Sequence, residues 1–368
     1  MGKLTARGND ALLRLLCEGR LRWINLVQNH LGLSTAMAIG NALQGANASL
    51  TELGLNYSGI GDEGAMGLGA ALAVNVSLKT LSLYNCNIAV RGAVAIGKAL
   101  AVNASLTHLS LPNNSIGLSG ATAIGKALKV NTSLKVLDLC GNKIGSEGGD
   151  AIAKGLEANA SLKSIALHGN SLARSSWRAI FLALRDNKDN KIESWDLSNE
   201  NINDAIVQVL AEYASVSTSL KTLDLSSNAI GSEGATAIAK ALEVNASLKM
   251  LRLFSNNIGD QGGIAIARAL EVNASLTTLL LGPSRISNEG AKALASTLEV
   301  NTSLKSLNLE IDHNSGNGND EGWIAIGNAL ANASLTKLFV DRTNISNKAK
   351  TKLRGVAAAR ASLTIYGV

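Results

Sequence analysis

The sequence contains little proline, cysteine or aromatic residue. Of its 368 residues only 2 are proline and 3 are cysteine, and aromatic side chains make up 3%. No linker rich in proline, glycine and serine divides the chain, so we expect one elongated domain. The three cysteines, Cys17, Cys86 and Cys140, are an odd number without zinc-finger spacing. This argues against a disulfide framework and favours a reducing compartment.

Long hydrophobic runs are also lacking. Charged residues interrupt the first 20 positions, and no stretch is long and apolar enough to span a membrane. We therefore predict no signal peptide, no membrane partner and a cytoplasmic location. The net charge of +6 comes from the two ends of the chain. Because a continuous basic stripe is missing, we predict no nucleic-acid partner.

What the sequence does contain is a repeat of 28 residues. In the copy from Leu220 to Ser247, large apolar residues stand at offsets 0, 3, 5 and 10 from the first leucine. This alternation predicts a short strand that enters a turn. From Ala235 to Leu242 the apolar residues follow a helical stripe instead. One repeat is therefore a strand, a turn, a helix and a second turn.

A single repeat buries too little apolar surface to be stable alone, so the copies must stack side by side. We predict an N-terminal capping helix at 1–20, twelve repeats at 21–362 and a terminal strand at 363–368. The predicted strands begin at Leu21, Leu50, Leu78, Leu106, Leu134, Leu162, Ile192, Leu220, Leu248, Leu276, Leu304, Leu335 and Leu363.

Small polar residues recur at fixed positions of the repeat. The asparagine at offset 8 is suited to hydrogen-bond the turn, and the asparagine at offset 25 to end the helix in a left-handed conformation. Aspartate or serine at offset 12 follows a turn glycine and predicts the N-cap of the helix in the same repeat. Nine of the twelve Asn-x-Ser/Thr sequons fall at offset 25, so we interpret them as structural.

The pattern Leu-x-x-Leu-x-Leu-x-x-Asn/Cys-x-Ile/Leu resembles the leucine-rich repeats of the ribonuclease-inhibitor type, which also form the sensor end of NOD-like receptors. The resemblance covers Leu21 to Val368. It implies an α/β fold, a right-handed solenoid or horseshoe with a parallel sheet of about 13 strands on the concave face and helices on the convex face. The Ran GTPase-activating protein is similar in repeat style, but a basic end here replaces its acidic tail.

The residues at offsets 2, 4, 6 and 7 should face the concave surface, because those at 0, 3 and 5 point inward. Most are serine, threonine, asparagine or glycine. The exceptions are large or charged, which is the composition of protein-binding hot spots. We predict that the following residues bind a protein partner: Trp23, Tyr57, Tyr84, His108, Met250, Arg252, Phe254, Leu280, Phe339 and Arg342.

A second set on the same surface suggests chemistry. Cys140 and His168 share offset 6 in adjacent repeats, about 4.8 Å apart, and Asp138 lies on the same strand as Cys140. A Cys–His–Asp nucleophile or a zinc site is one interpretation. The other interpretation is that sequence variation among the repeats has placed polar residues side by side on an open surface. Since no oxyanion donors or closed pocket can be named, we predict no catalytic residue, no metal and no cofactor.

These observations lead to three hypotheses. The first is a non-enzymatic scaffold that binds a protein partner on the concave face. The second is a structural subunit of a larger assembly that uses its ends and its convex face. The third is a GTPase-activating protein of the Ran type. The terminal strand at 363–368 offers an edge through which the chain could also associate with itself.

Overall fold

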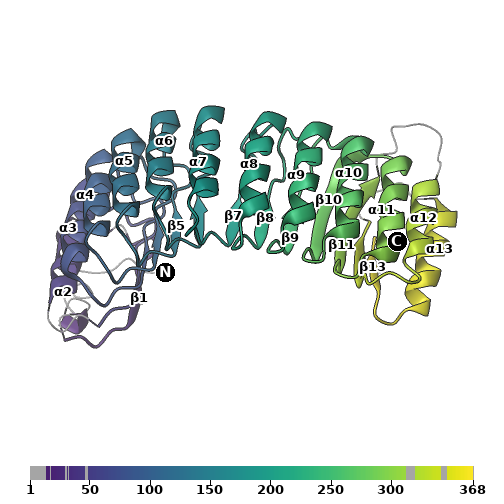
Figure 1. The fold of residues 1–368 in the computed structure, drawn as a ribbon. Coiled ribbons are helices and arrows are strands. Elements are labelled where there is room, and N and C mark those ends of the chain that lie inside the picture. Colours follow the sequence, from purple (N-terminus) through teal and green to yellow (C-terminus); the bar gives the residue numbers. More distant parts are fainter. Residues whose placement is uncertain are drawn as a thin grey trace. The chain divides into compact units, whose positions relative to one another are not determined.

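The computed structural model describes residues 14–16, 18–29, 31, 33–45, 49–311, 320–340 and 346–367. The chain forms two compact units, unit 1 (Met1–Ile192) and unit 2 (Glu193–Val368). Strands and helices alternate throughout both, as Figure 1 shows. Most of the predicted capping helix at 1–20 lies outside the described residues, although 14–16 are helical.

Unit 1 is a parallel sheet with helices packed along one side. Its strands pair in chain order. They are β1 (Trp23–Asn25), β2 (Glu52–Gly54), β3 (Thr80–Ser82), β4 (His108–Ser110), β5 (Val136–Asp138) and β6 (Ser164–Ala166). The helices are α2 (Leu33–Gln44), α3 (Gly61–Val74), α4 (Val90–Leu100), α5 (Gly117–Leu128), α6 (Gly145–Leu156) and α7 (Arg174–Asp186).

Unit 2 follows the same plan, again with parallel strands in chain order. Its strands are β7 (Ser194–Asp196), β8 (Thr222–Asp224), β9 (Met250–Arg252), β10 (Thr278–Ile286), β11 (Ser306–Ile311), β12 (Lys337–Phe339) and β13 (Thr364–Tyr366). Its helices are α8 (Asp204–Val216), α9 (Ser232–Val244), α10 (Gly259–Val272), α11 (Asn288–Val300), α12 (Glu321–Ala329) and α13 (Asn347–Ala359). Both units confirm the predicted α/β solenoid.

The core is built as the repeat predicts. In the copy that begins at Leu220, the side chains at offsets 0, 3, 5 and 10 are at most 2% exposed. Each of these side chains packs between the sheet and the helices of its own repeat and its neighbours, so burial is shared along the stack. One register is wrong: Tyr366 pairs with Phe339, which stands at offset 4. The last repeat is therefore one residue shorter than the placement at Leu363 assumed, and Tyr366 is not an inward-pointing residue.

The asparagines at offset 8 hydrogen-bond turn backbone groups, as predicted, and they also connect adjacent repeats. The Nδ2 of Asn114 donates to the carbonyls of Leu83 and Leu111 at 2.8 and 2.9 Å. Its Oδ1 accepts from the backbone N–H groups of Cys86 and Ile88, both at 3.0 Å. One buried amide thus satisfies four backbone groups from two repeats.

The asparagines at offset 25 also hold neighbouring repeats together, but the predicted left-handed conformation is wrong. Asn75 ends α3 with φ −73° and ψ 133°, which is extended backbone. Its Oδ1 accepts from the N–H groups of Ser77 and Leu78, and its Nδ2 donates to the carbonyl of Leu43 in the preceding repeat. The side chain, rather than a left-handed backbone, therefore satisfies the groups beyond the helix end.

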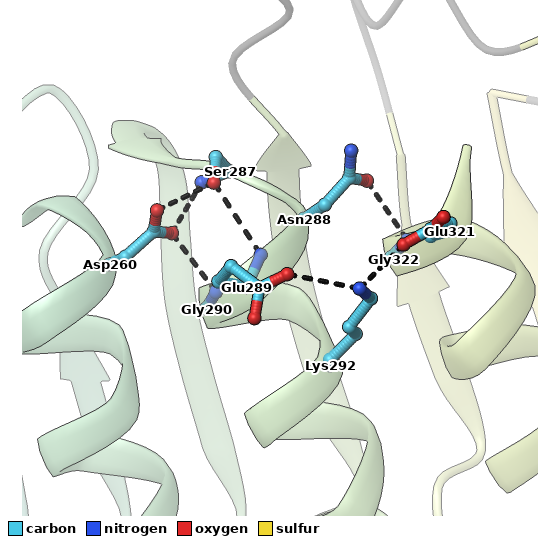
Figure 2. A network of polar contacts seen from close by, with 8 residues as sticks. All are labelled: Asp260, Ser287, Asn288, Glu289, Gly290, Lys292, Glu321 and Gly322. Carbon is cyan, nitrogen blue, oxygen red and sulfur yellow. Dashed lines mark hydrogen bonds and ion pairs between the residues drawn. The ribbon is translucent and has the colours of Figure 1, made fainter. Parts of the chain in front are cut away.

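The acidic residues at offset 12 do not cap the helix of their own repeat, so this prediction is wrong; they cap the helix of the following repeat. Asp62 accepts from the N–H groups of Ala89 and Gly92, both at 2.8 Å, and so caps α4 of the following repeat. In unit 2, Asp260 accepts from the N–H groups of Ser287 and Gly290 at 2.8 and 2.9 Å and from the Ser287 hydroxyl at 2.5 Å, as Figure 2 shows. A carboxylate at the positive end of the next helix stabilises the contact between repeats.

A lysine extends this network to the next helix. Lys292 Nζ lies 3.0 Å from Glu289 and 2.6 Å from Glu321 of α12 (Figure 2). The hydrogen bonds to Glu321 and then Glu289 raise the pKa of Lys292 above its ordinary value. Asn288 accepts from the N–H of Gly322 at 2.9 Å, the same capping contact made by an amide. The edge of the helices is thus tied together by side chains from successive repeats.

Cys86 replaces asparagine at offset 8 and makes stability depend on pH. The thiol donates to the Leu55 carbonyl at 3.0 Å, and burial raises its pKa above the usual value near 9.0. The folded state favours the neutral thiol. The contribution of the thiol to the free energy of unfolding is therefore fully present below pH 9.0, the ordinary pKa. It is lost as the pH rises towards the folded-state pKa, because only the unfolded chain then ionises. We expect the free energy of unfolding to fall by about 1.4 kcal/mol per pH unit in that window.

The matched variant is Cys86→Ser, which keeps a hydroxyl donor that does not titrate there. Urea unfolding of both proteins from pH 7 to 10.5 isolates the thiol, since all other groups are shared. The two stability curves should diverge above about pH 9. Parallel curves would show that this thiol is not held neutral by the fold.

Candidate protein-binding surfaces

The strand face of unit 1 carries three aromatic side chains near its beginning, of which Trp23 and Tyr57 are exposed and Tyr84 is half-buried. We call strand face the surface formed by the residues at offsets 2, 4, 6 and 7. Trp23 is 68% exposed and Tyr57 39%, whereas Trp177, the other tryptophan of the unit, is 2% exposed. The rings of Tyr57 and Tyr84 meet edge to face with centroids 4.8 Å apart. These rings lie outside the core and present apolar surface to solvent.

Tyr57 occupies a backbone conformation that bulky residues avoid. Its φ is 58°, in the left-handed region. The same offset holds asparagine, glycine or serine in the next seven repeats, with φ between 51° and 69°. A side chain with a Cβ costs about 1 kcal/mol there. The hydrogen bond to the Tyr84 side chain, together with partial desolvation, raises the pKa of Tyr57 above its ordinary value.

In the middle of unit 1, two of the three residues suspected of chemistry, Cys140 and His168, contact each other through their side chains. Cys140 Sγ lies 3.1 Å from His168 Nδ1, as the shared offset predicts. Asp138 Oδ1 instead accepts from the backbone N–H of Cys140 at 3.0 Å. A Cys–His–Asp relay is therefore not formed. In the described part of the chain, no three ligand-type side chains gather as a metal site. His108 is exposed, with its Nδ1 2.8 Å from the Thr107 hydroxyl.

Unit 2 places four of the predicted residues on or just after the neighbouring strands β9 and β10. Phe254 is 37% exposed, and Met250 and Leu280 are half-buried. Leu280 stands opposite Arg252 in the sheet register. Arg252 is not available as an independent cation, because its Nη1 lies 3.0 Å from Asp224 Oδ2 on β8. The surface therefore offers apolar side chains beside a neutralised ion pair.

The structure adds one residue that sequence reasoning missed. Phe339 stacks on Tyr366 with ring centroids 4.5 Å apart and planes 6° from parallel. Tyr366 is 41% exposed and lies on the strand face because of the corrected register. An alignment of Tyr366 with Phe339 rather than of Leu363 with Leu335 would have found it. Arg342, the last predicted contact, lies outside the described residues.

The repeats themselves identify the architecture. Seven segments match the family model described as Leucine Rich repeat, at residues 46–69, 74–97, 102–125, 130–153, 216–239, 244–267 and 272–295. The chain carries leucine-rich repeats. Each matched segment joins the end of one leucine-rich repeat to the strand and helix of the next, so the offsets used above are positions of this repeat.

Residues 154–215 fall between the matched leucine-rich repeats, and their cores contain large aromatic residues. Trp177 and Phe181 of α7 stack with centroids 5.9 Å apart. In unit 2, Trp195 of β7 meets Tyr213 of α8 edge to face at 6.4 Å. All four side chains are at most 2% exposed. The departure from the repeat is therefore a repacked core rather than an exposed site.

Beyond the repeats, the similarity of this chain to known proteins is limited. No curated protein matches the sequence. Among solved structures, "Leiomodin-1 Actin-Binding Site 2 (ABS2)" is 23% identical, with a TM-score of 0.36, over 49% of this chain and 95% of that chain. The Caenorhabditis elegans tropomodulin C-terminal domain is 17% identical, with a TM-score of 0.35, over 51% of this chain and 99% of that chain. In the described residues of these leucine-rich repeats, no helix is both long and apolar enough to cross a membrane.

Proposed function

We propose that this chain is a non-enzymatic recognition scaffold that binds a protein partner through its strand face. The observation that carries the proposal is the exposure of Trp23, at 68%, while the other three tryptophans are at most 2% exposed. Tryptophan and tyrosine at a surface are the side chains most enriched in binding hot spots. Tyr57 supports the proposal as well, because its ring is presented at a conformational cost.

The apolar residues of unit 2 form a second proposed binding surface, on the strand face of that unit. Met250 and Leu280 lie on the adjacent strands β9 and β10, and Phe254 follows β9 by two residues. The stacked Phe339 and Tyr366 lie further along the strand face of unit 2. An apolar group beside a neutralised ion pair fits the centre of an interface, where unpaired charges are depleted.

The test measures the affinity of a partner for variants of the strand face. Partners captured on the immobilised protein are identified by mass spectrometry, purified and titrated by calorimetry. Phe254→Ala is expected to weaken binding about 30-fold, the effect of a hot-spot truncation, without loss of fold. The matched control is Val244→Ala, which truncates an equally apolar residue that is 67% exposed at the end of α9.

A second candidate is a structural subunit that assembles through its helix side. It is favoured by a column of exposed valines one repeat apart at the helix ends, which are Val74, Val102 and Val130 in unit 1 and Val216, Val244, Val272 and Val300 in unit 2. If Val244→Ala weakens binding and Phe254→Ala does not, this candidate replaces the first. Equal affinity of all variants for every purified partner would contradict both.

The finer classification also belongs to the proposal. The step of 28 residues and the strand–turn–helix plan support leucine-rich repeats of the ribonuclease-inhibitor-like type. A cytoplasmic location is supported by the buried sequon asparagines, since their amides are already committed to the fold. Asn103 and Asn131, for example, are each 5% exposed.

A further inference from the structure

The first three strands enclose a hollow on the strand face of unit 1. It has a volume of about 210 Å³, and we call it the β1–β3 hollow. Gly54 of β2 lies in its floor, where a Cβ would stand 3.0 Å from Asn25 Oδ1. The side chains that matter for its chemistry are Trp23, Asn25, Glu52, Asn56, Thr80 and Ser82.

An aromatic ring and a carboxylate stand side by side at this hollow. Trp23 and Glu52 are register partners on β1 and β2, so their backbones lie about 4.8 Å apart. Both side chains are exposed. Within the described residues Glu52 forms no ion pair. Arg22 and Lys79, the cations that stand one residue before β1 and β3, do not line the hollow.

The amide oxygens of the hollow are hydrogen-bonded, but its donor groups have no acceptor in the described residues. Asn25 Oδ1 accepts from the N–H of Val27 at 3.3 Å, and Asn56 Oδ1 accepts from the N–H of Tyr84 at 2.8 Å. These bonds fix the amides and leave both NH₂ groups without a protein acceptor. The hydroxyls of Thr80 and Ser82 have none either. Asn103, in contrast, uses both ends of its amide within the fold.

We propose that the β1–β3 hollow binds a basic side chain, a guanidinium or an ammonium, of the protein partner. This inference rests on the proposed function, since it names the partner group that the strand face receives. The indole face attracts a cation, and Glu52 supplies the opposite charge. The amide NH₂ groups of Asn25 and Asn56 are donors for carbonyls of the peptide that carries the cation.

Other occupants fit the hollow less well. An acidic side chain would be repelled by Glu52. An apolar side chain would take the carboxylate and the amide donors out of water without replacing their hydrogen bonds. A basic side chain satisfies the aromatic wall, the charge and the oriented donors together.

Trp23 itself reports on the test, because it is the one exposed tryptophan of the four in the chain. The probes are acetyl-Gly-Arg-Gly-amide, its lysine analogue and its citrulline analogue, which has the shape of arginine without the charge. The readout is the indole ¹H–¹⁵N resonance of Trp23 during titration. We expect a saturable shift with the arginine or lysine peptide and none with the citrulline peptide. The stronger of the two basic peptides identifies the cation.

Two variants separate the hollow from the rest of the face. Glu52→Gln removes the charge from an exposed position and is expected to weaken the basic peptide about 5-fold. Gly54→Val fills the floor without changing any charge and is expected to abolish saturation. Equal shifts with the arginine and citrulline peptides, or a Glu52→Gln protein that binds as the native one does, would overturn the inference.

The same variants keep this inference distinguishable from the proposed function. Suppose that Phe254→Ala weakens a purified partner while Glu52→Gln and Gly54→Val leave its affinity unchanged. The scaffold function then stands and the hollow is not its cation site. If the basic peptides bind the hollow and Phe254→Ala has no effect on any partner, the hollow stands and the proposed interface in unit 2 is wrong.

Discussion

Asn131→Ala is expected to lower the free energy of unfolding of unit 1 by about 3 kcal/mol. The Asn131 Nδ2 donates to the carbonyls of Leu100 and Asn103 at 2.8 and 2.9 Å. Its Oδ1 accepts from the N–H groups of Ser133 and Leu134 at 3.1 and 2.8 Å. Alanine removes these four hydrogen bonds at a site that is 5% exposed, and within the described residues the Asn103 carbonyl keeps only the Ser133 hydroxyl, 3.4 Å away. Each lost hydrogen bond costs about 1 kcal/mol, and less where water or this hydroxyl replaces it.

The matched control lies in the same column of the repeat. Asn332 also stands three residues before the first leucine of a strand, but its side chain is exposed and makes no hydrogen bond in the described residues. Asn332→Ala should therefore change stability by less than about 0.5 kcal/mol. Urea unfolding gives the totals, and hydrogen exchange shows where protection is lost. Similar losses for the two variants would mean that asparagine acts through local propensity rather than through its bonds.

Gly125→Ala is the second substitution with a large expected effect, a loss of about 3 kcal/mol from one methyl group. Gly125 lies where α5 packs on α6. A Cβ on it would clash with the carbonyl oxygen of Ala151 and lie 2.8 Å from its carbonyl carbon. These are backbone atoms of a helix, so no side chain can turn away, and the two helices would have to separate.

A glycine-to-alanine substitution is expected to increase stability where the added Cβ meets no other atom. A Cβ on Gly355, in α13, would have no atom within 4 Å. Gly355→Ala should stabilise the protein by up to about 1 kcal/mol, because alanine favours the helix. Thermal unfolding of the two variants beside the native protein compares them directly. A Gly125→Ala protein as stable as the native one would show that α5 and α6 can move apart at little cost.

The fold could be predicted from the sequence because each repeat states the same pattern. The spacing of Leu220, Leu223, Leu225 and Ile230 fixes a strand and a turn, and the repetition fixes parallel pairing in chain order. Contacts between repeats were harder to predict. Asp62 was assigned to its own helix because local rules see only neighbours in sequence, whereas its carboxylate caps α4 in the following repeat.

The sequence predicts which residues lie on the strand face, but it does not predict which of their side chains contact each other. Trp23, Tyr57 and Phe254 were found because alternation fixes which side of a strand a residue faces. The neutralisation of Arg252 by Asp224 depends on rotamers across two strands, which spacing does not specify. Tyr366 was missed because a single-residue change of register moves a side chain to the other face.

The asparagines at offset 25 have a consequence for how the protein can be made. Where these asparagines are buried, their Nδ2 atoms, to which N-linked sugars attach, donate within the fold, as Asn103 does to Leu72 and Asn75. A sugar could therefore reach a buried sequon such as that of Asn103 only on an unfolded chain, and the glycosylated chain could not then close its repeats. Production in a eukaryotic secretory pathway should yield misfolded glycoprotein, whereas a host that does not glycosylate should yield the native stack.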